Sequence, residues 1–186
     1  MTRKRQGGPA PMNHLEHHRD AGPASLFPLA REAILTWHLQ EGAGVIARPR
    51  RRVRAGMIVN LRLNPVWPTS PRRLRGHDLN VRVGSCEVLE VIDEPRAAGF
   101  VYRTLPGHLE SGEQTFLVSI GADDRLGDLS ASDDRLIVSI VSDSVPGHPL
   151  LRAFAPFSVA AQRMMARRYV EGLRRMLDRR QDDVRA

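Results

Sequence analysis

The chain has 186 residues and a formal net charge of +7, and its length predicts one domain able to bury a sizeable core. Its one cysteine, Cys86, excludes an internal disulfide, and no stretch is long and apolar enough to span a membrane. The basic N-terminus has no apolar segment behind it, so we expect no secretory signal and a reducing, cytoplasmic setting.

The first 24 residues are rich in Gly, Pro, Arg and His and lack apolar periodicity, which predicts a disordered basic tail over 1–24. Several potential metal ligands occur in this stretch: His14, Glu16, His17, His18 and Asp20. A metal ion binds well only where the ligands are already ordered, and a flexible tail does not supply that order. We therefore expect no metal site.

A short helix is predicted to begin at Pro28 and to end at Gly42 or Gly44. Its apolar positions recur at helical spacing, and Trp37 among them is expected to anchor the helix on a sheet. The arginine-rich stretch 48–54 follows. It could bind phosphate, but no aromatic residues alternate with the arginines to stack on bases, so a solvated connection is favoured.

Apolar patterns predict strands over five stretches: 57–63, 79–92, 97–101, 115–120 and 136–141. The segment 64–75 between the first two contains three prolines and reads as a loop. Trp67 lies in this loop, where we expect it either to cover one end of the core or to form the lip of a pocket. The segment 121–134 is a second connection.

The hairpin between 97–101 and 115–120 contains the turn signals Pro106-Gly107 and Ser111-Gly112. Its reactive side chains are Tyr102, Arg103, His108, Glu110 and Glu113. A histidine near a carboxylate can exchange a proton near neutral pH, which makes His108 with Glu110 or Glu113 the best catalytic candidate. Tyr102 could donate a hydrogen bond to a carbonyl.

A structural role for these side chains stays open, because Arg103 and Glu110 could form a cross-strand ion pair. Strand alternation predicts that Phe116 faces the core and that Glu113 faces away from it. A second pair of this kind, His77-Asp78, precedes the strand 79–92.

The end of the chain predicts a long amphipathic helix, whose apolar stripe is Phe157, Ala161, Met165, Tyr169, Leu173 and Leu177. We expect this stripe to pack across the concave face of the sheet. Methionine adapts to the shape of what it contacts, so Met165 also suits the wall of a cavity. The domain is predicted to span 25–181, with a disordered C-terminus over 182–186.

The central hairpin also carries a family resemblance. Its run Tyr102-x-Thr104-Leu105-Pro106-Gly107-His108-x-Glu110-x-Gly112-Glu113-x-x-Phe116 resembles the hallmark of the family known as domain of unknown function 1990. That family is similar in predicted architecture to the helix-grip proteins of the START and pollen-allergen types. The resemblance implies an α+β helix-grip fold, in which a curved antiparallel β-sheet packs around a long C-terminal α-helix. It implies a fold more than an activity.

The first functional hypothesis is a cavity-containing protein that binds a small, largely apolar metabolite between the sheet and the last helix. The candidate catalytic residues are His108, Glu110 and Tyr102, and the candidate ligand-binding residues are Arg103, Trp67, Met165 and Tyr169. An alternative is a cyclase, dehydratase or isomerase that acts through His108 and a carboxylate. A nucleic-acid binder is the third and least favoured class. No cofactor motif is present, and the sequence makes no prediction of the oligomeric state.

Overall fold

The computed structural model describes residues 13–69, 73–74, 77–121, 134–146 and 155–185. Within these ranges the chain forms a seven-stranded antiparallel sheet in the order β1-β9-β8-β7-β6-β3-β2. Its strands are β1 (Asn13–Pro23), β2 (Val45–Arg48), β3 (Ile58–Leu63), β6 (Val81–Asp93), β7 (Ala97–Thr104), β8 (Glu110–Gly121) and β9 (Arg135–Pro146). The short strands β4 (Arg73–Leu74) and β5 (His77–Asp78) pair separately.

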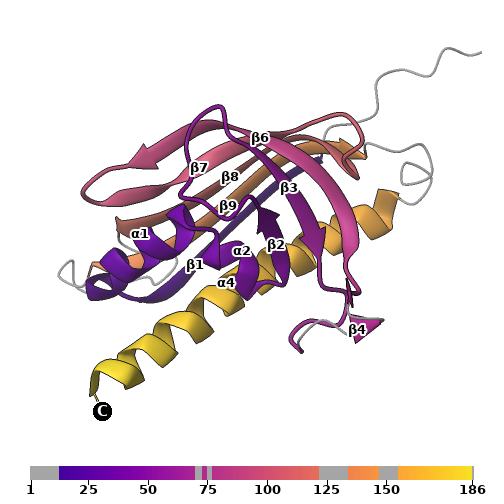
Figure 1. The fold of residues 1–186 in the computed structure, drawn as a ribbon. Helices are drawn as coiled ribbons and strands as arrows, with labels where there is room; N and C mark the ends of the chain where they lie inside the picture. The colour runs from indigo at the N-terminus through magenta and orange to yellow at the C-terminus, as the bar shows by residue number, and fades with distance from the viewer. Residues whose placement is uncertain (1–12, 70–72, 75–76, 122–133, 147–154, 186) are drawn as a thin grey trace, which may run out of the picture.

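The helices are η1 (Ala24–Leu26), α1 (Phe27–Leu35), α2 (His38–Gly42) and the long α4 (Ala155–Arg185). The sheet curves, and α4 runs across its concave side (Figure 1). The predicted helix-grip architecture is therefore confirmed. The predicted central hairpin is confirmed as β7 and β8.

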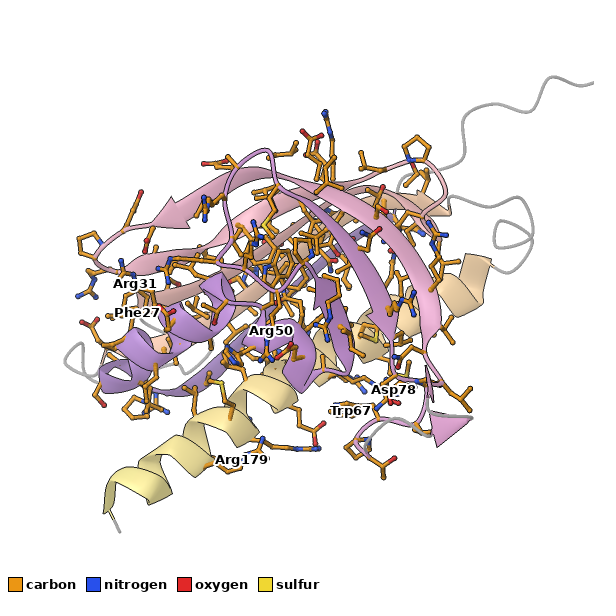
Figure 2. The ribbon with its side chains drawn as sticks, viewed as in Figure 1. Phe27, Arg31, Arg50, Trp67, Asp78 and Arg179 are labelled. Atoms are coloured by element: carbon orange, nitrogen blue, oxygen red, sulfur yellow. The ribbon has the colours of Figure 1, made fainter. Side chains whose placement is uncertain are left out.

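Side chains fill the space between the sheet and the helices (Figure 2). Aromatic rings pack against one another in this core. The Trp37 ring lies 4.9 Å from that of Phe100, and Phe116 meets Tyr169 of α4 edge to face, also at 4.9 Å. Phe116 is buried and Glu113 is exposed, as strand alternation predicts. Trp37 is the anchor that the sequence indicates.

The buried side of α4 agrees with the predicted stripe at Tyr169, Leu173 and Leu177. It is wider than that stripe, because Ala166 and Val170 are also buried and a 3.6-residue period brings them onto the same side. The side chains of Phe157 and Ala161 lie outside the described part of the structure.

The expected single helix after Pro28 is two helices. Trp37 adopts a left-handed backbone conformation with φ 68°, which ends α1 and lets α2 begin at His38. The break places the indole in the core, where its Nε1 donates to the carbonyl of Arg51 at 2.9 Å. Burial of the large ring and this hydrogen bond offset the unfavourable backbone conformation.

The predicted disordered tail over 1–24 is wrong for residues 13–23, which form β1 and pair with residues 135–144 of β9. Backbone hydrogen bonds hold this edge strand, so it needs few apolar residues. Asp20 also accepts hydrogen bonds from Arg135 at 2.7 Å and from the amide of Gly22 at 2.7 Å. Burial alone would raise the pKa of Asp20, but these partners together lower it. The ordered domain therefore includes β1 and does not start at residue 25.

The predicted domain end at residue 181 is also corrected, because α4 continues to Arg185.

Helix α2 meets α4 at two glycines, Gly42 and Gly172, whose backbones touch. A Cβ atom on Gly172 would lie 2.3 Å from the carbonyl carbon of Gly42, a distance that no side chain tolerates. The close contact fixes where α4 crosses beneath α2.

Replacing Leu173 by Ala tests the packing of α4. The side chain is fully buried, so the lost transfer energy and the cavity left behind should destabilise the fold by about 2–5 kcal/mol in denaturant melts. The matched control is Met164→Ala on the exposed side of the same helix, which should change stability by less than about 0.5 kcal/mol. Equal effects of the two substitutions would contradict this packing.

Candidate functional site

A cavity of about 200 Å³ lies between α4, the β7–β8 turn and the strands β2, β3 and β6. Its apolar lining consists of Val45, Leu61, Leu63, Val83, Leu109 and Met165. Its polar lining consists of Tyr102, His108, Glu110, Gln114, Gln162 and Tyr169. An engineered cavity of about 150 Å³ in another protein binds benzene, so this volume suits a ligand of about one ring.

The β7–β8 turn brings His108 to this cavity. Leu105 to His108 form a turn closed by a bond from the His108 amide to the Leu105 carbonyl at 3.1 Å. Gly107 has φ 89°, as a type II turn requires after proline. The His108 side chain packs over Gly84 of β6, where a Cβ atom would lie 2.7 Å from the imidazole Cδ2. Glycine at position 84 therefore makes room for the ring.

His108 is 9% exposed, and the backbone of Glu110 holds its imidazole. Its Nδ1 lies 2.9 Å from the Glu110 carbonyl oxygen and 3.1 Å from the Glu110 amide nitrogen, while its Nε2 has no partner in the described structure. Burial lowers the pKa of His108, and the bond to Glu110 opposes that shift only in part. The ring is therefore neutral at neutral pH.

The Glu110 side chain faces α4. Its Oε1 accepts a hydrogen bond from Gln162 Nε2 at 3.1 Å, and the same amide donates to Ser144 Oγ at 2.8 Å. The second carboxyl oxygen makes no hydrogen bond with the described residues. Burial raises the pKa of Glu110, and the bond from Gln162 acts in the opposite direction.

Two tyrosines complete the polar lining. Tyr102 donates its hydroxyl proton to Gln114 Oε1 at 2.7 Å. Tyr169 is buried, and its hydroxyl makes no hydrogen bond with the described residues. Burial, and then the nearby Glu110 carboxylate, raise the pKa of Tyr169, so its hydroxyl stays protonated and can donate to a ligand.

The structure brings five of the seven predicted site residues to this cavity: Tyr102, His108, Glu110, Met165 and Tyr169. Arg103 does not reach it. Strand alternation turns its side chain to the other face of the sheet, where Nη2 donates to Glu87 at 2.8 Å. Trp67 lines a different cavity. Arg103 and Trp67 are therefore absent from the lining of the apolar cavity.

Two further details differ from expectation. His108 bonds the backbone of Glu110 and not its carboxylate. Sequence reasoning did not select Gln114 and Gln162 as site residues, although a glutamine on the buried side of α4 is a signal for such a role. The second candidate pair, His77-Asp78, belongs to β5, and Asp78 lines a third cavity.

No group of three or more potential metal ligands occurs among the described residues. The N-terminal histidines are instead spread along β1, with His14 Nδ1 2.7 Å from Asp143 and His18 Nδ1 2.7 Å from Ser139. No helix in the described ranges is long and apolar enough to cross a membrane.

Chemically, the cavity presents an apolar wall together with a neutral imidazole, a carboxyl group of raised pKa and a tyrosine hydroxyl. Such a wall can hold an apolar molecule, while the free hydroxyl and carboxyl oxygen can bond one polar substituent. A carboxyl group of raised pKa can also exchange a proton with a bound molecule.

The lowered pKa of His108 predicts a pH dependence of stability. The folded protein binds this proton less tightly than the unfolded chain, so the contribution of His108 is present above pH 6.5 and is lost as pH falls through the lowered pKa. Glu110 acts in the opposite sense, since its raised pKa makes its contribution fall as pH rises.

His108→Asn isolates the first effect, because an asparagine amide can replace Nδ1 in the turn but does not titrate. Denaturant melts between pH 7.5 and 5 should show a steeper loss of stability in the wild type than in the variant. Parallel curves would mean that His108 protonates equally easily in both states.

Solved structures of similar shape share little sequence with this chain. A hypothetical protein from Helicobacter pylori is 12% identical, with a TM-score of 0.49, and the match covers 91% of this chain and 89% of that one. A protein from Mycobacterium smegmatis is 13% identical, with a TM-score of 0.47 and coverages of 90% and 98%. Truncated norcoclaurine synthase from Thalictrum flavum is 11% identical, with a TM-score of 0.46 and coverages of 86% and 92%.

No curated protein is significantly similar in sequence to this chain. One family model, in contrast, matches residues 1–172 and so includes the turn with His108, the strands around the cavity and most of α4. The chain therefore belongs to the family described as Domain of unknown function (DUF1990).

Proposed function

We propose that this protein binds a small molecule of about one ring, largely apolar and with one polar substituent, in the cavity between the sheet and α4. The observation that carries the proposal is that two polar groups of the lining, the Tyr169 hydroxyl and one Glu110 oxygen, make no bond to the described residues. Both groups can bond a ligand, and Nε2 of His108 in the same lining is buried without a partner among the described residues. A ligand that bonds this nitrogen would remove the free-energy cost of leaving it unpaired.

The ligand would lie with its ring among Leu63, Val83 and Met165 and with its polar substituent toward Glu110 and Tyr169. Apolar contact would supply most of the affinity, and the polar pair would fix the orientation. Gln162 supports this arrangement because it bonds one oxygen of Glu110, while the other has no hydrogen-bond partner in the described part of the chain.

Phenol and toluene are matched probes of this arrangement, since they share a ring and differ in the hydroxyl. Tyr169→Phe removes only a hydroxyl that has no hydrogen-bond partner among the described residues, so stability should change little. The variant should bind phenol about 2–10-fold more weakly, which corresponds to the loss of one hydrogen bond of about 0.5–1.5 kcal/mol. Its affinity for toluene should stay within about twofold; ligand-detected NMR titration measures both.

The location of the cavity is tested separately by filling it. Met165→Trp should abolish the binding of both probes, because the larger side chain occupies the apolar part of the cavity. Met164→Trp, on the exposed side of the same helix, should leave binding unchanged. A thermal melt of each variant confirms the fold. Unchanged binding in a folded Met165→Trp variant would place the ligand elsewhere.

A second candidate function is proton transfer to or from the bound molecule. The raised pKa of Glu110 favours this alternative, because burial shifts the pKa of the carboxyl group toward the range in which it can act as acid or base. Native mass spectrometry of the purified chain would identify a co-purifying molecule, which is then incubated with the protein in deuterium oxide. An enzyme would exchange a carbon-bound proton for deuterium, and Glu110→Gln would not. No exchange in the wild type would leave a binding protein.

A further inference from the structure

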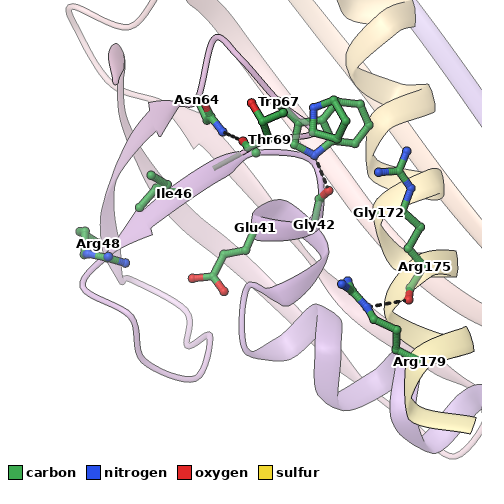
Figure 3. A pocket seen from close by; sticks show the side chains of 12 residues that line it. Glu41, Gly42, Ile46, Arg48, Asn64, Trp67, Thr69, Gly172, Arg175 and Arg179 are labelled. Carbon is green, nitrogen blue, oxygen red and sulfur yellow. Dashed lines mark hydrogen bonds between the residues drawn. The ribbon is translucent and has the colours of Figure 1, made fainter. Parts of the chain in front are cut away.

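A second cavity, of about 380 Å³, lies where the end of α2, the strand β2 and the second half of α4 meet (Figure 3). Its lining is Glu41, Gly42, Gly44, Ile46, Arg48, Asn64, Trp67, Pro68, Thr69, Gly172, Arg175 and Arg179. It shares no lining residue with the apolar cavity. Three of its twelve lining residues are arginines.

These arginines are held in place through few of their N–H groups. Arg48 donates to the neighbouring carbonyl of Ala47 at 3.0 Å, and Arg179 donates from Nε to the carbonyl of Arg175 at 3.1 Å. Neither has a carboxylate partner among the described residues. Their other N–H groups make no hydrogen bond with the described residues and can donate to a ligand.

Trp67 contacts Arg175, the third arginine of the lining. Its indole Nε1 donates to the carbonyl of Gly42 at 2.8 Å, which fixes the ring as one wall of the cavity (Figure 3). The guanidinium of Arg175 lies 5.0 Å from the ring centre, and that of Arg168 lies 4.8 Å from it. Arg175 also pairs with Glu171 of its own helix. Cation–π contacts therefore hold positive charge at the rim.

The lining contains one carboxylate, Glu41, and its charge must be weighed against the arginines. Glu41 accepts a hydrogen bond from Arg50 Nη2 at 2.6 Å, so a further cation already neutralises it. With Arg50 included, positive groups around the cavity outnumber negative ones even after Glu41 and Glu171 are counted. The local field favours an anion.

We propose that this cavity binds the phosphate groups of a small phosphorylated molecule, with Arg48, Arg175 and Arg179 as the donors. A guanidinium donates paired N–H groups whose geometry matches phosphate, and several of them around one cavity suit a group of more than one negative charge. The volume lies in the range of small-molecule sites. The ring of Trp67 carries guanidinium groups and is not a free platform for a base, which disfavours a nucleic-acid strand.

Calorimetric titration of the full chain with sodium pyrophosphate at low salt tests this site. The wild type should bind one pyrophosphate per chain. Arg48→Gln/Arg179→Gln removes two exposed donors of the lining and should weaken binding by about tenfold or more. The charge-matched control is Arg31→Gln/Arg96→Gln, whose arginines pair with Asp93 and Asp134 and line neither cavity. Arg31 and Trp67 lie at opposite sides of the view in Figure 2.

The control should stay within about twofold of the wild type. Equal weakening by both double variants would show binding to diffuse positive charge and would overturn the proposal, as would the absence of binding by the wild type at millimolar pyrophosphate. A single-stranded DNA of about 20 nucleotides is titrated in parallel. If the wild type bound this strand more tightly than pyrophosphate, and the Arg48→Gln/Arg179→Gln variant did not bind it, the proposal would also be overturned and the surface would be assigned to nucleic acid. The apolar probes report on the other cavity, so failure of one proposal leaves the other testable.

Discussion

The contact between the backbones of Gly42 and Gly172 determines how α4 sits against the rest of the protein. No side chain separates α2 from α4 at this point, so the helices can approach no closer and cannot slide without losing the contact. Gln162, Met165 and Tyr169 precede it along α4 and line the apolar cavity. Arg175 and Arg179 follow it and line the arginine-rich cavity. One packing constraint thus positions both candidate sites.

The two cavities differ in chemistry because residues on opposite faces of the edge strand β2 line them. Val45 of β2 points into the apolar cavity, whereas its neighbours on either side, Gly44 and Ile46, line the other one. Successive residues of a strand face opposite sides, so a strand of four residues is enough to separate an apolar environment from a charged one. Within the apolar cavity, burial keeps His108 neutral and favours the protonated form of Glu110.

Strong local patterns made much of the fold predictable from the sequence: the apolar stripe of α4 and the turn signal Pro106-Gly107 both gave the correct element. β1 was missed, because an edge strand held by backbone hydrogen bonds can have the polar composition of a disordered tail. Arg103 was assigned by its neighbours in the chain, although alternation from Tyr102 already placed it on the opposite face. Gln114 and Gln162 were not selected, since the value of an amide depends on partners that only the tertiary structure supplies.

A crystal structure of the protein soaked with phenol would show the ligand itself. The proposed binding site predicts density for one ring between Leu63, Val83 and Met165, with the hydroxyl at hydrogen-bond distance from Tyr169 or Glu110. Phenol bound only at other surfaces, with the cavity beneath α4 unoccupied at saturating concentration, would contradict it.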